Sequence, residues 1–301
     1  MDEKDRFRGC LLGLATGDAV GTALEFRPRG SFAPISDMIG GGPFGLAPGE
    51  WTDDTSMALC LATSLVETGR FDPMDQMFRY WQWAEGGYLS SNGRCFDIGN
   101  TVAAALRRYR NTGNPFAGAT DPRSAGNGCI MRLAPVPMFY YPDEEAAVRY
   151  AAQSSRTTHG APECIDACRL LAGILVRALA GRTIEEVVFA GGVNFAGSPS
   201  ISAIARGEYR RKAVSEILGS GYVVESLEAA LWCFLCTDTF ETAILRAANL
   251  GDDADTTAAV CGQVAGAYYG ASSIPQRWLE RLVMREQITE LADRLYGEKA
   301  V

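Results

Sequence analysis

The chain has 301 residues, of which 47% are hydrophobic and 21% charged, as in a globular protein that buries a substantial core. Its net charge of -8 argues against general binding to nucleic-acid backbones or anionic membrane surfaces. Nine cysteines without a framework spacing favour a reducing compartment. With a charged N-terminus and no apolar run of about 18 residues, we expect a cytoplasmic protein without membrane insertion.

The chain begins with a segment of small and apolar residues that predicts a helix. Residues 6–24 contain repeated glycines and alanines, which would let this helix approach its neighbours closely. The segment ends at Glu25, a carboxylate between Leu24 and Phe26. A partly buried glutamate is costly unless it is paired or functional. Residues 27–50 then form a loop rich in proline and glycine, and long loops in compact domains are usually functional or disordered.

An acidic cluster, Thr52, Asp53 and Asp54, follows that loop. Apolar residues from Met57 to Val66 repeat at helical spacing, so the cluster lies at the start of a predicted helix. The loop that leads into it is therefore interpreted as part of a site. A second helix is predicted over 73–84, with a proline at its start.

A polar loop over 90–99 precedes a helical run over 102–109. Asp97 and Asn100 lie where the two meet, and either could cap the helix or contribute to a site. Further along, the small residues of 124–128 form a loop whose backbone amides could cradle a phosphate. Such a loop is a weak signal by itself.

Helices are predicted over 144–157 and 161–180, with His159 between them. This is the only histidine of the chain. A single loop histidine is more often incidental than catalytic, so His159 alone does not indicate a function.

A second acidic cluster occupies 251–257, where three aspartates and two threonines stand in seven residues. It lies before the last of three helices predicted over 225–270. Gly262, Gly266 and Gly270 form a stripe of small residues on that helix. The stripe would permit tight packing behind the acidic cluster.

The fold class follows from the pattern of apolar residues. No stretch shows the sustained alternation of a half-buried strand, which predicts an all-α fold. The two acidic clusters lie far apart in the sequence, and we expect them to meet in one core. The chain is therefore predicted to form one compact helical domain over residues 1–301.

The acidic clusters predict a metal site. Carboxylate and hydroxyl oxygens suit Mg²⁺, Mn²⁺ or Ca²⁺, whereas zinc prefers sulfur and imidazole ligands. Four or more carboxylates around a single cation would over-neutralise it, which favours two divalent ions. The alternative is helix capping, since Asp and Thr are preferred N-cap residues, but capping needs only one or two of these side chains. Both interpretations can hold together.

Five elements of the sequence form a recognisable set: Gly17–Gly21 with Glu25, Thr52–Thr55, Gly126–Gly128 with Met131 and Arg132, Thr158 with His159, and Gly251–Thr256. Taken together, they resemble the ADP-ribosylglycohydrolase family, and within it the bacterial dinitrogenase reductase-activating glycohydrolase branch. That resemblance implies an all-α bundle with a dinuclear Mg²⁺ or Mn²⁺ cleft. It also implies a hydrolase that removes ADP-ribose from modified protein side chains, which makes an ADP-ribosylated protein the expected partner.

The family resemblance also implies roles for individual residues. The implied metal ligands are Thr52, Asp53, Asp54, Asp253, Asp255 and Thr256, with Glu25 next to the second ion. The implied substrate-binding residues are Asp97, Asn100, Ser124, Gly126, Asn127, Gly128, His159 and Tyr222, of which Tyr222 would stack on adenine.

For catalysis the resemblance implies Glu25, Asp54 and Asp97. Cleavage of the glycosidic bond passes through an oxocarbenium-like state, which nearby carboxylates stabilise while one accepts the proton of the attacking water. The sequence leaves open which carboxylate is that base. A guanidinium donates paired N–H bonds to a carboxylate, so Asp97 predicts that the cleaved linkage is to arginine.

Two other functions remain open at this stage. One is a dinuclear-metal phosphohydrolase acting on nucleotides, which would release phosphate instead of ADP-ribose. The other is a catalytically silent member that binds ADP-ribose. The sequence does not choose between Mg²⁺ and Mn²⁺, and it gives neither the target protein nor the oligomeric state.

Overall fold

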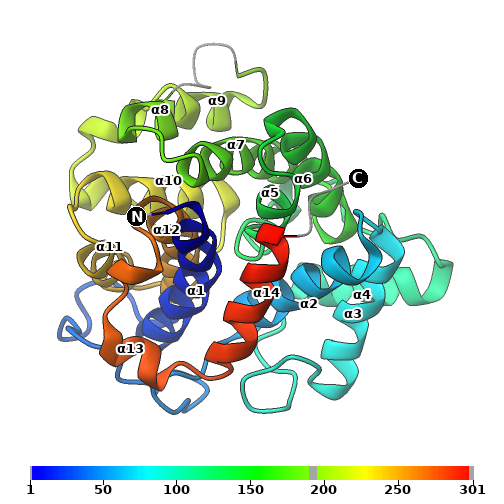
Figure 1. The fold of residues 1–301 in the computed structure, drawn as a ribbon, viewed down its shortest axis with the longest axis horizontal. Helices are drawn as coiled ribbons and strands as arrows, with labels where there is room; N and C mark the ends of the chain where they lie inside the picture. Colours follow the sequence, from blue (N-terminus) through cyan, green and yellow to red (C-terminus); the bar gives the residue numbers. More distant parts are fainter. Residues whose placement is uncertain (1, 190–194, 298–301) are drawn as a thin grey trace.

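The structure is a computed structural model that describes residues 2–189 and 195–297, and within these residues it is all-α (Figure 1). The extended pairings there are isolated bridges, not strands of a sheet. The predicted fold class is confirmed. The α-helices are α1 (Glu3–Gly21), α2 (Asp53–Thr68), α3 (Pro73–Gly86), α4 (Asn100–Thr112), α5 (Pro135–Tyr140), α6 (Glu144–Thr158), α7 (Pro162–Leu179), α8 (Ile184–Phe189), α9 (Pro199–Ala205), α10 (Val223–Leu235), α11 (Phe240–Ala248), α12 (Ala254–Tyr269), α13 (Gln276–Arg281) and α14 (Arg285–Gly297).

Helices α1 and α12 pack against each other backbone to backbone (Figure 1). A Cβ atom placed on Gly13 would lie 2.3 Å from the carbonyl oxygen of Gly262, and one on Gly17 would lie 2.2 Å from that of Ala258. No side chain fits at such distances, so only glycine is compatible with this helix spacing. The close packing predicted for both small-residue segments is confirmed. One detail differs, because α12 ends at Tyr269 and Gly270 lies beyond it as the C-cap.

This helix pair is antiparallel, since Gly9 lies opposite Gly266 and Gly21 lies opposite Ala254. The end of α1 therefore meets the start of α12. Helix α2 begins beside these two helix ends. The acidic residues at all three ends lie close together. The two acidic clusters meet there, as the sequence led us to expect.

The other helices surround this centre. Helices α6 and α7 form a second pair, and α14 lies between α1 and α2 in Figure 1 and contacts both. The long loop before α2 contains no α-helix, in agreement with the sequence analysis. Helices α5, α8, α9 and α13 have six or seven residues, too few to show a helical period in the sequence. No helix in the described part of the chain has the length and apolar character needed to cross a membrane.

Candidate active site

The start of α2 is capped by a residue from another helix. Thr52 is the N-cap residue, but its side chain makes no capping bond. Instead the carboxylate of Asp18, on α1, accepts the backbone N–H groups of Thr52 and Thr55 at 2.9 and 3.0 Å. It also accepts both threonine hydroxyls, at 3.0 and 2.6 Å. Asp53 and Asp54, in the first turn of α2, are therefore not needed as caps.

The second acidic cluster does not cap its own helix either. Asp253 is the N-cap residue of α12, and its side chain makes no capping bond there. Near Asp97 the N-cap of α4 is Gly99, again without a side-chain bond. Side-chain capping therefore does not account for these acidic residues, and the capping alternative is wrong for them.

The carboxylates of the two clusters lie within reach of one another. Thr256 donates from its hydroxyl to Asp54 Oδ1 at 3.2 Å, and the hydroxyl of Thr52 lies 3.3 Å from Asp255 Oδ2. One oxygen from each of Glu25, Asp97 and Asp255 lies within 4.8 Å of the others, a spacing suited to one cation. Three buried carboxylate oxygens at this centre have no hydrogen-bond partner within the described chain: Glu25 Oε2, Asp54 Oδ2 and Asp255 Oδ1.

Burial, reinforced by mutual repulsion in all but Asp18, raises the pKa of the carboxyl groups here, which are Asp18, Glu25, Asp53, Asp54, Asp97, Asp253 and Asp255. Burial, with repulsion from Asp97, raises the pKa of Glu25 to about 10. Burial, with repulsion from Asp253, raises the pKa of Asp97 to about 7. Asp18 is raised by burial to a pKa of about 6, although its four hydrogen bonds oppose the shift. The group cannot be fully ionised near neutral pH without a positive charge, and its hard oxygens fit a divalent cation.

Asn127 joins the loop 124–128 to the second acidic cluster. Its side-chain amide donates to Asp253 Oδ2 at 2.6 Å and to the hydroxyl of Ser226 at 3.2 Å. Its backbone N–H donates to the carbonyl oxygen of Gly221 at 3.1 Å. The predicted phosphate-binding loop and the predicted metal ligands therefore form one connected structure.

His159 is buried beneath the same loop. Its ring contacts Gly126 and Gly128, and a Cβ atom on Gly128 would lie 2.8 Å from the ring carbon Cε1. Burial lowers the pKa of His159 to about 4, so the ring is neutral near pH 7. The histidine was a weak candidate in the sequence, and the structure places it at the wall of the cleft.

The hydrogen bonds around His159 favour one tautomer. Arg132 donates to the hydroxyl of Thr158 at 2.6 Å, and that hydroxyl lies 2.8 Å from His159 Nδ1. Because arginine has only donors, the Thr158 oxygen accepts from Arg132 and directs its own proton to Nδ1. Nε2 then carries the ring proton, on the side that faces Gly126 and Gly128.

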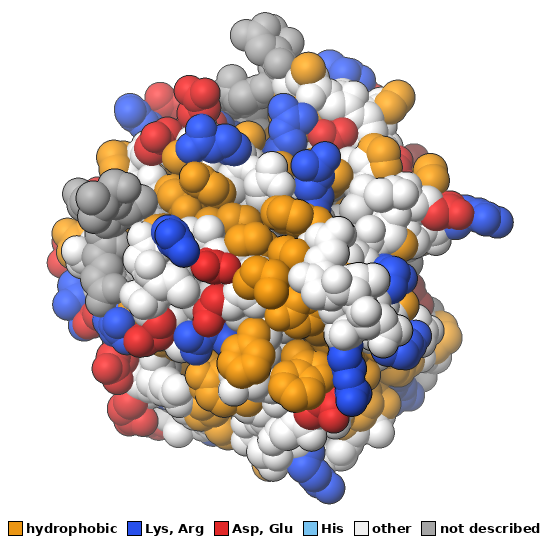
Figure 2. Space-filling model, turned by 90° about the vertical axis from the view of Figure 1, so that its right-hand side faces the viewer, with side chains coloured by type: hydrophobic (Ala, Val, Ile, Leu, Met, Phe, Trp, Pro, Cys, Tyr) orange, Lys and Arg blue, Asp and Glu red, His pale blue; other side chains and the backbone are white. Residues whose placement is uncertain are grey.

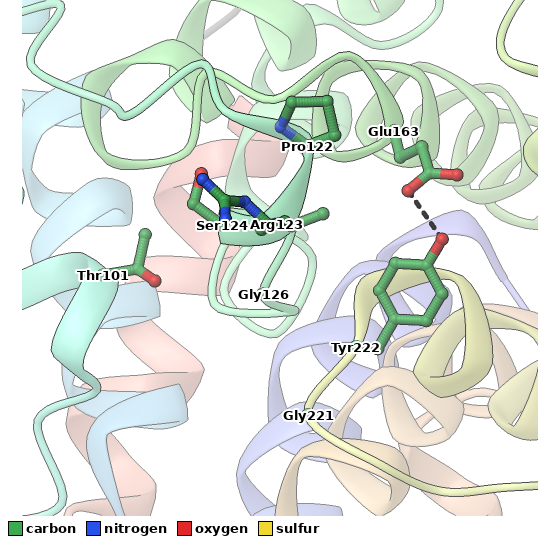
Figure 3. Close-up of a pocket in the computed structure, with 9 residues that line it drawn as sticks. Thr101, Pro122, Arg123, Ser124, Gly126, Glu163, Gly221 and Tyr222 are labelled. Atoms are coloured by element: carbon green, nitrogen blue, oxygen red, sulfur yellow. Dashed lines mark hydrogen bonds between the residues drawn. The ribbon is translucent and has the colours of Figure 1, made fainter.

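Two adjoining cavities form the binding region. The acidic cleft, of about 630 Å³, is lined by Glu25, Phe26, Asp53, Asp97, Gly99, Asn100, Thr101, Val102, Gly126, Asn127, Gly128, Met131, His159, Ser220, Gly221, Asp252, Asp253, Asp255 and Thr256. The tyrosine cavity, of about 560 Å³, shares Thr101, Gly126 and Gly221 with it and is also lined by Pro122, Arg123, Ser124, Ala125, Glu163 and Tyr222 (Figure 3).

In the tyrosine cavity, Tyr222 is held by a carboxylate. Its hydroxyl donates to Glu163 Oε2 at 2.6 Å, the dashed contact in Figure 3. The other oxygen of Glu163 accepts the hydroxyl of Ser200 at 2.5 Å. Both carboxylate oxygens are thus engaged, and the ring of Tyr222 has a fixed direction along the cavity wall. The hydroxyl of Ser124 donates to the carbonyl oxygen of Asp121 at 2.6 Å.

The residues proposed from the sequence fall into three groups. Eleven line the acidic cleft, Thr52 and Asp54 are buried beneath it, and Ser124 and Tyr222 line the tyrosine cavity. Four further residues were not assigned a role from the sequence: Asp18, Phe26, Arg132 and Glu163. An aspartate inside an apolar helical run was the available signal for Asp18, whereas Glu163 gave none.

An all-α fold with buried carboxylates at one end of such a cleft defines a class, and the chain belongs to it: the model of the ADP-ribosylglycohydrolase family matches residues 1–301. The chain is 47% identical to the ADP-ribosylarginine hydrolase Tri1 of Serratia proteamaculans, over 97% of this chain and 79% of that protein. It is 32% identical to the ADP-ribosyl-[dinitrogen reductase] glycohydrolase of Rhodospirillum rubrum, over 93% of this chain and 91% of that protein.

A solved structure supports the same assignment. The chain superposes with a TM-score of 0.86 on a chain of an ADP-ribosylglycohydrolase-related protein complex, at 43% identity and with 98% of both chains covered. The family resemblance drawn from the sequence motifs is therefore confirmed.

Proposed function

We propose that the protein is a metal-dependent hydrolase that removes ADP-ribose from arginine side chains of modified proteins. Relatives at 47% identity that are named ADP-ribosylarginine hydrolases favour this activity over the phosphohydrolase alternative. One observation carries the proposal for this chain. Buried carboxylates with three unpartnered oxygens adjoin a glycine loop, and a neutral histidine lies at the wall of the same cleft, which supports a cation site beside an anion site.

For the cation site, we assign two divalent ions, Mg²⁺ or Mn²⁺, to the two acidic clusters. Such ions would orient the ribose hydroxyls and lower the pKa of a bound water. Asp97 lies beside this set, with one oxygen within 4.8 Å of an oxygen of Glu25 and of Asp255. Asp54 is buried beneath the cleft, so we assign it to metal binding in preference to proton transfer. The proposed ligands are Glu25, Thr52, Asp53, Asp54, Asp253, Asp255 and Thr256.

For proton transfer, the carboxylates at the surface of the cleft are the candidates. Glu25 lines the cleft and has one buried oxygen without a hydrogen-bond partner, so an acceptor position is free for the proton of a bound water. We assign the acceptance of the water proton to Glu25. Asp97, on the facing loop, is then available to the leaving side chain.

For the substrate, the loop 124–128 and the tyrosine cavity supply the binding groups. We assign the diphosphate to the backbone of Gly126 and Gly128 and to the Nε2–H of His159, a neutral donor that needs no counter-charge. Asn127 keeps the loop attached to Asp253 through its amide. The adenine would stack on Tyr222, beside Ser124, and the exposed Asn100 lies at the cleft mouth.

For the linkage, Asp97 supports arginine. A guanidinium can place two N–H groups on one carboxylate, a contact that a serine oxygen cannot reproduce. Asp97 itself has a left-handed backbone conformation, with φ of 59°.

For the location of the protein, the cysteines support the cytoplasm, because all nine are free.

The deciding experiment is hydrolysis of peptides with ADP-ribose on arginine or on serine, with and without Mg²⁺ or Mn²⁺. We expect free ADP-ribose from the arginine peptide only, and only with metal. Release of inorganic phosphate from nucleotides would favour the phosphohydrolase, and binding of ADP-ribose without turnover would favour a silent member. Asp97→Ser should lose arginine-linkage activity while keeping its melting temperature, since Asp97 does not cap α4.

A further inference from the structure

Strained backbone gathers at the acidic cleft. Five non-glycine residues in the described chain have a left-handed φ. Leu89 (54°) and Met284 (57°) pack against the core, and this burial offsets the cost of their conformation. The other three, Phe26 (59°), Asp97 (59°) and Asp252 (55°), line the acidic cleft. Strain of this kind persists where neighbouring structure enforces it, and it concentrates at ligand-binding sites.

Phe26 gains no burial in return for its conformation. Its side chain is 65% exposed, and a left-handed φ is unfavourable for so bulky a residue. Exposure alone does not single it out, because hydrophobic side chains also gather on the face in Figure 2, and Phe78 on α3 is 46% exposed. Phe26 differs because two backbone bonds hold it at the cleft. The N–H of Phe26 donates to the carbonyl oxygen of Asp252 at 2.7 Å, and the N–H of Asp252 donates to the carbonyl oxygen of Arg27 at 2.8 Å.

The position of Phe26 along the binding region suggests what it contacts. It lines the acidic cleft, whereas Tyr222 lines the tyrosine cavity on the far side of the shared residues. In ADP-ribosyl-arginine the adenine stands at one end and the guanidinium at the other, next to the ribose carbon that is cleaved. With adenine on Tyr222 and that ribose at the carboxylates, the guanidinium would extend within the acidic cleft, whose lining includes Phe26.

We propose that Phe26 is a specificity-determining residue whose ring stacks on the guanidinium of the modified arginine. The inference rests on the proposed function. A guanidinium is planar and weakly hydrated, and it is attracted to the face of an aromatic ring. Asp97 lines the same cleft and accepts N–H groups in the guanidinium plane. The ring and the carboxylate thus contact the face and the edge of one group, which a serine linkage lacks.

The first test compares Phe26→Leu with Phe26→Tyr and Phe26→Trp. Leucine keeps an apolar side chain but removes the aromatic face, so kcat/KM for an ADP-ribosyl-arginine peptide should fall about threefold to thirtyfold. Tyrosine and tryptophan should stay within about twofold of the wild type, because both keep that face. The Kd of free ADP-ribose, which has no guanidinium, should not change in any variant. Phe78→Leu is the matched control and should leave all of these values unchanged.

The second test separates recognition from a structural role. Phe26→Gly removes the ring and the backbone strain together, so the melting temperature should equal or exceed that of the wild type while kcat/KM falls. A lower melting temperature in Phe26→Gly would assign the ring to folding and overturn the inference. If the wild type cleaves the arginine peptide and Phe26→Leu keeps full activity, the inference about Phe26 is overturned and the proposed function stands. A wild type that fails to cleave that peptide would overturn both.

Discussion

At the acidic cleft one buried oxygen each of Glu25, Asp54 and Asp255 lacks a hydrogen-bond partner in the described chain, whereas beside the tyrosine cavity the polar side chains bond one another. The first region is held together against like-charge repulsion by the helices around it. The second is complete without a ligand, since Glu163 fixes Tyr222.

The two regions therefore differ in how favourable their interactions are before a ligand binds. A region that stays electrostatically unfavourable until a cation arrives gains its stability from that cation, and its affinity for metal is correspondingly high. A region with satisfied hydrogen bonds loses little entropy when a planar base stacks on it. Changes at the acidic cleft should therefore affect metal binding and turnover, whereas changes at the tyrosine cavity should affect substrate affinity.

The largest effect is expected for Asp255→Asn. Asp255 belongs to the second cluster and reaches the first, with one oxygen near Thr52 and the other unpartnered, so its neutralisation removes charge that both proposed ions need. Turnover should be lost, and calorimetric titration should show weaker binding of Mg²⁺ or Mn²⁺. Asp252→Asn is the matched control, because asparagine tolerates the left-handed backbone at that position. Undiminished activity of the wild type in EDTA would contradict this prediction.

Glu25→Gln should reduce kcat by about a hundredfold or more, the range for a lost general acid-base group. The melting temperature of the metal-free variant should stay level or rise, because glutamine removes a carboxyl group that burial keeps from ionising. Kinetics and calorimetry on the same preparation test both expectations. Parallel losses of activity and stability would show that Glu25 serves the fold instead.

The metal-free protein should lose stability as the pH rises from 7 to 8. The pKa of Glu25 is about 10 in the folded state and ordinarily 4.5, so in this window the folded state holds a proton that the unfolded state has released. One such proton lowers the free energy of unfolding by about 1.4 kcal/mol per pH unit. His159 does not interfere, because its pKa is about 4 in the folded state and ordinarily 6.5, so its opposite effect lies mainly between these two values, below pH 7.

Calorimetry in EDTA at several pH values tests this expectation. Added Mg²⁺ or Mn²⁺ should flatten the pH dependence, since a bound cation takes the place of the protons. Glu25→Gln in EDTA should make it shallower, because the variant lacks one of the carboxyl groups that hold a proton in the folded state. A melting temperature of the metal-free wild type that stays constant from pH 7 to 8 would contradict the assignment of an unpaired acidic site.

The smallest effect is expected in the tyrosine cavity. Glu163→Ala frees the ring of Tyr222, so KM should rise about fivefold with kcat nearly unchanged, as for the loss of one modest positioning contact. Glu163→Gln should restore KM, because an amide oxygen still accepts the tyrosine hydroxyl. Tyr222→Phe should match Glu163→Ala, and the double variant should be no worse than either. A fall in kcat would place this pair in the chemistry instead of in binding.

Much of this arrangement could be predicted because its signals are local in the sequence. Short stretches of sequence are enough to recognise two of its features. These are the closely spaced carboxylates of Thr52–Asp54 and Gly251–Thr257, and the glycines at helical spacing. Asp18 could not be assigned in the same way, because it caps a helix that begins more than thirty residues later in the chain. Glu163 pairs with Tyr222 across 59 residues, and no pattern in either segment announces the contact.

Backbone conformation was the other gap. The left-handed φ of Phe26 and Asp97 is imposed by the loops around them: it is unfavourable for a bulky phenylalanine, and aspartate adopts it only where its surroundings require it. Conformational propensities of the residue types therefore do not single out either position. Only their hydrogen bonds and the shape of the cleft show that the chain holds them there.

The contact of Gly13 and Gly17 with the carbonyls of α12 has a consequence for how the enzyme can vary. Side chains in a core can repack around a neighbour of a different shape, but a carbonyl oxygen moves only if its helix moves. A single methyl group added at Gly13 would therefore separate α1 from α12 and, with them, Asp18 from Asp255. The spacing between the two halves of the acidic centre is thus set by residues without side chains, which never meet the substrate.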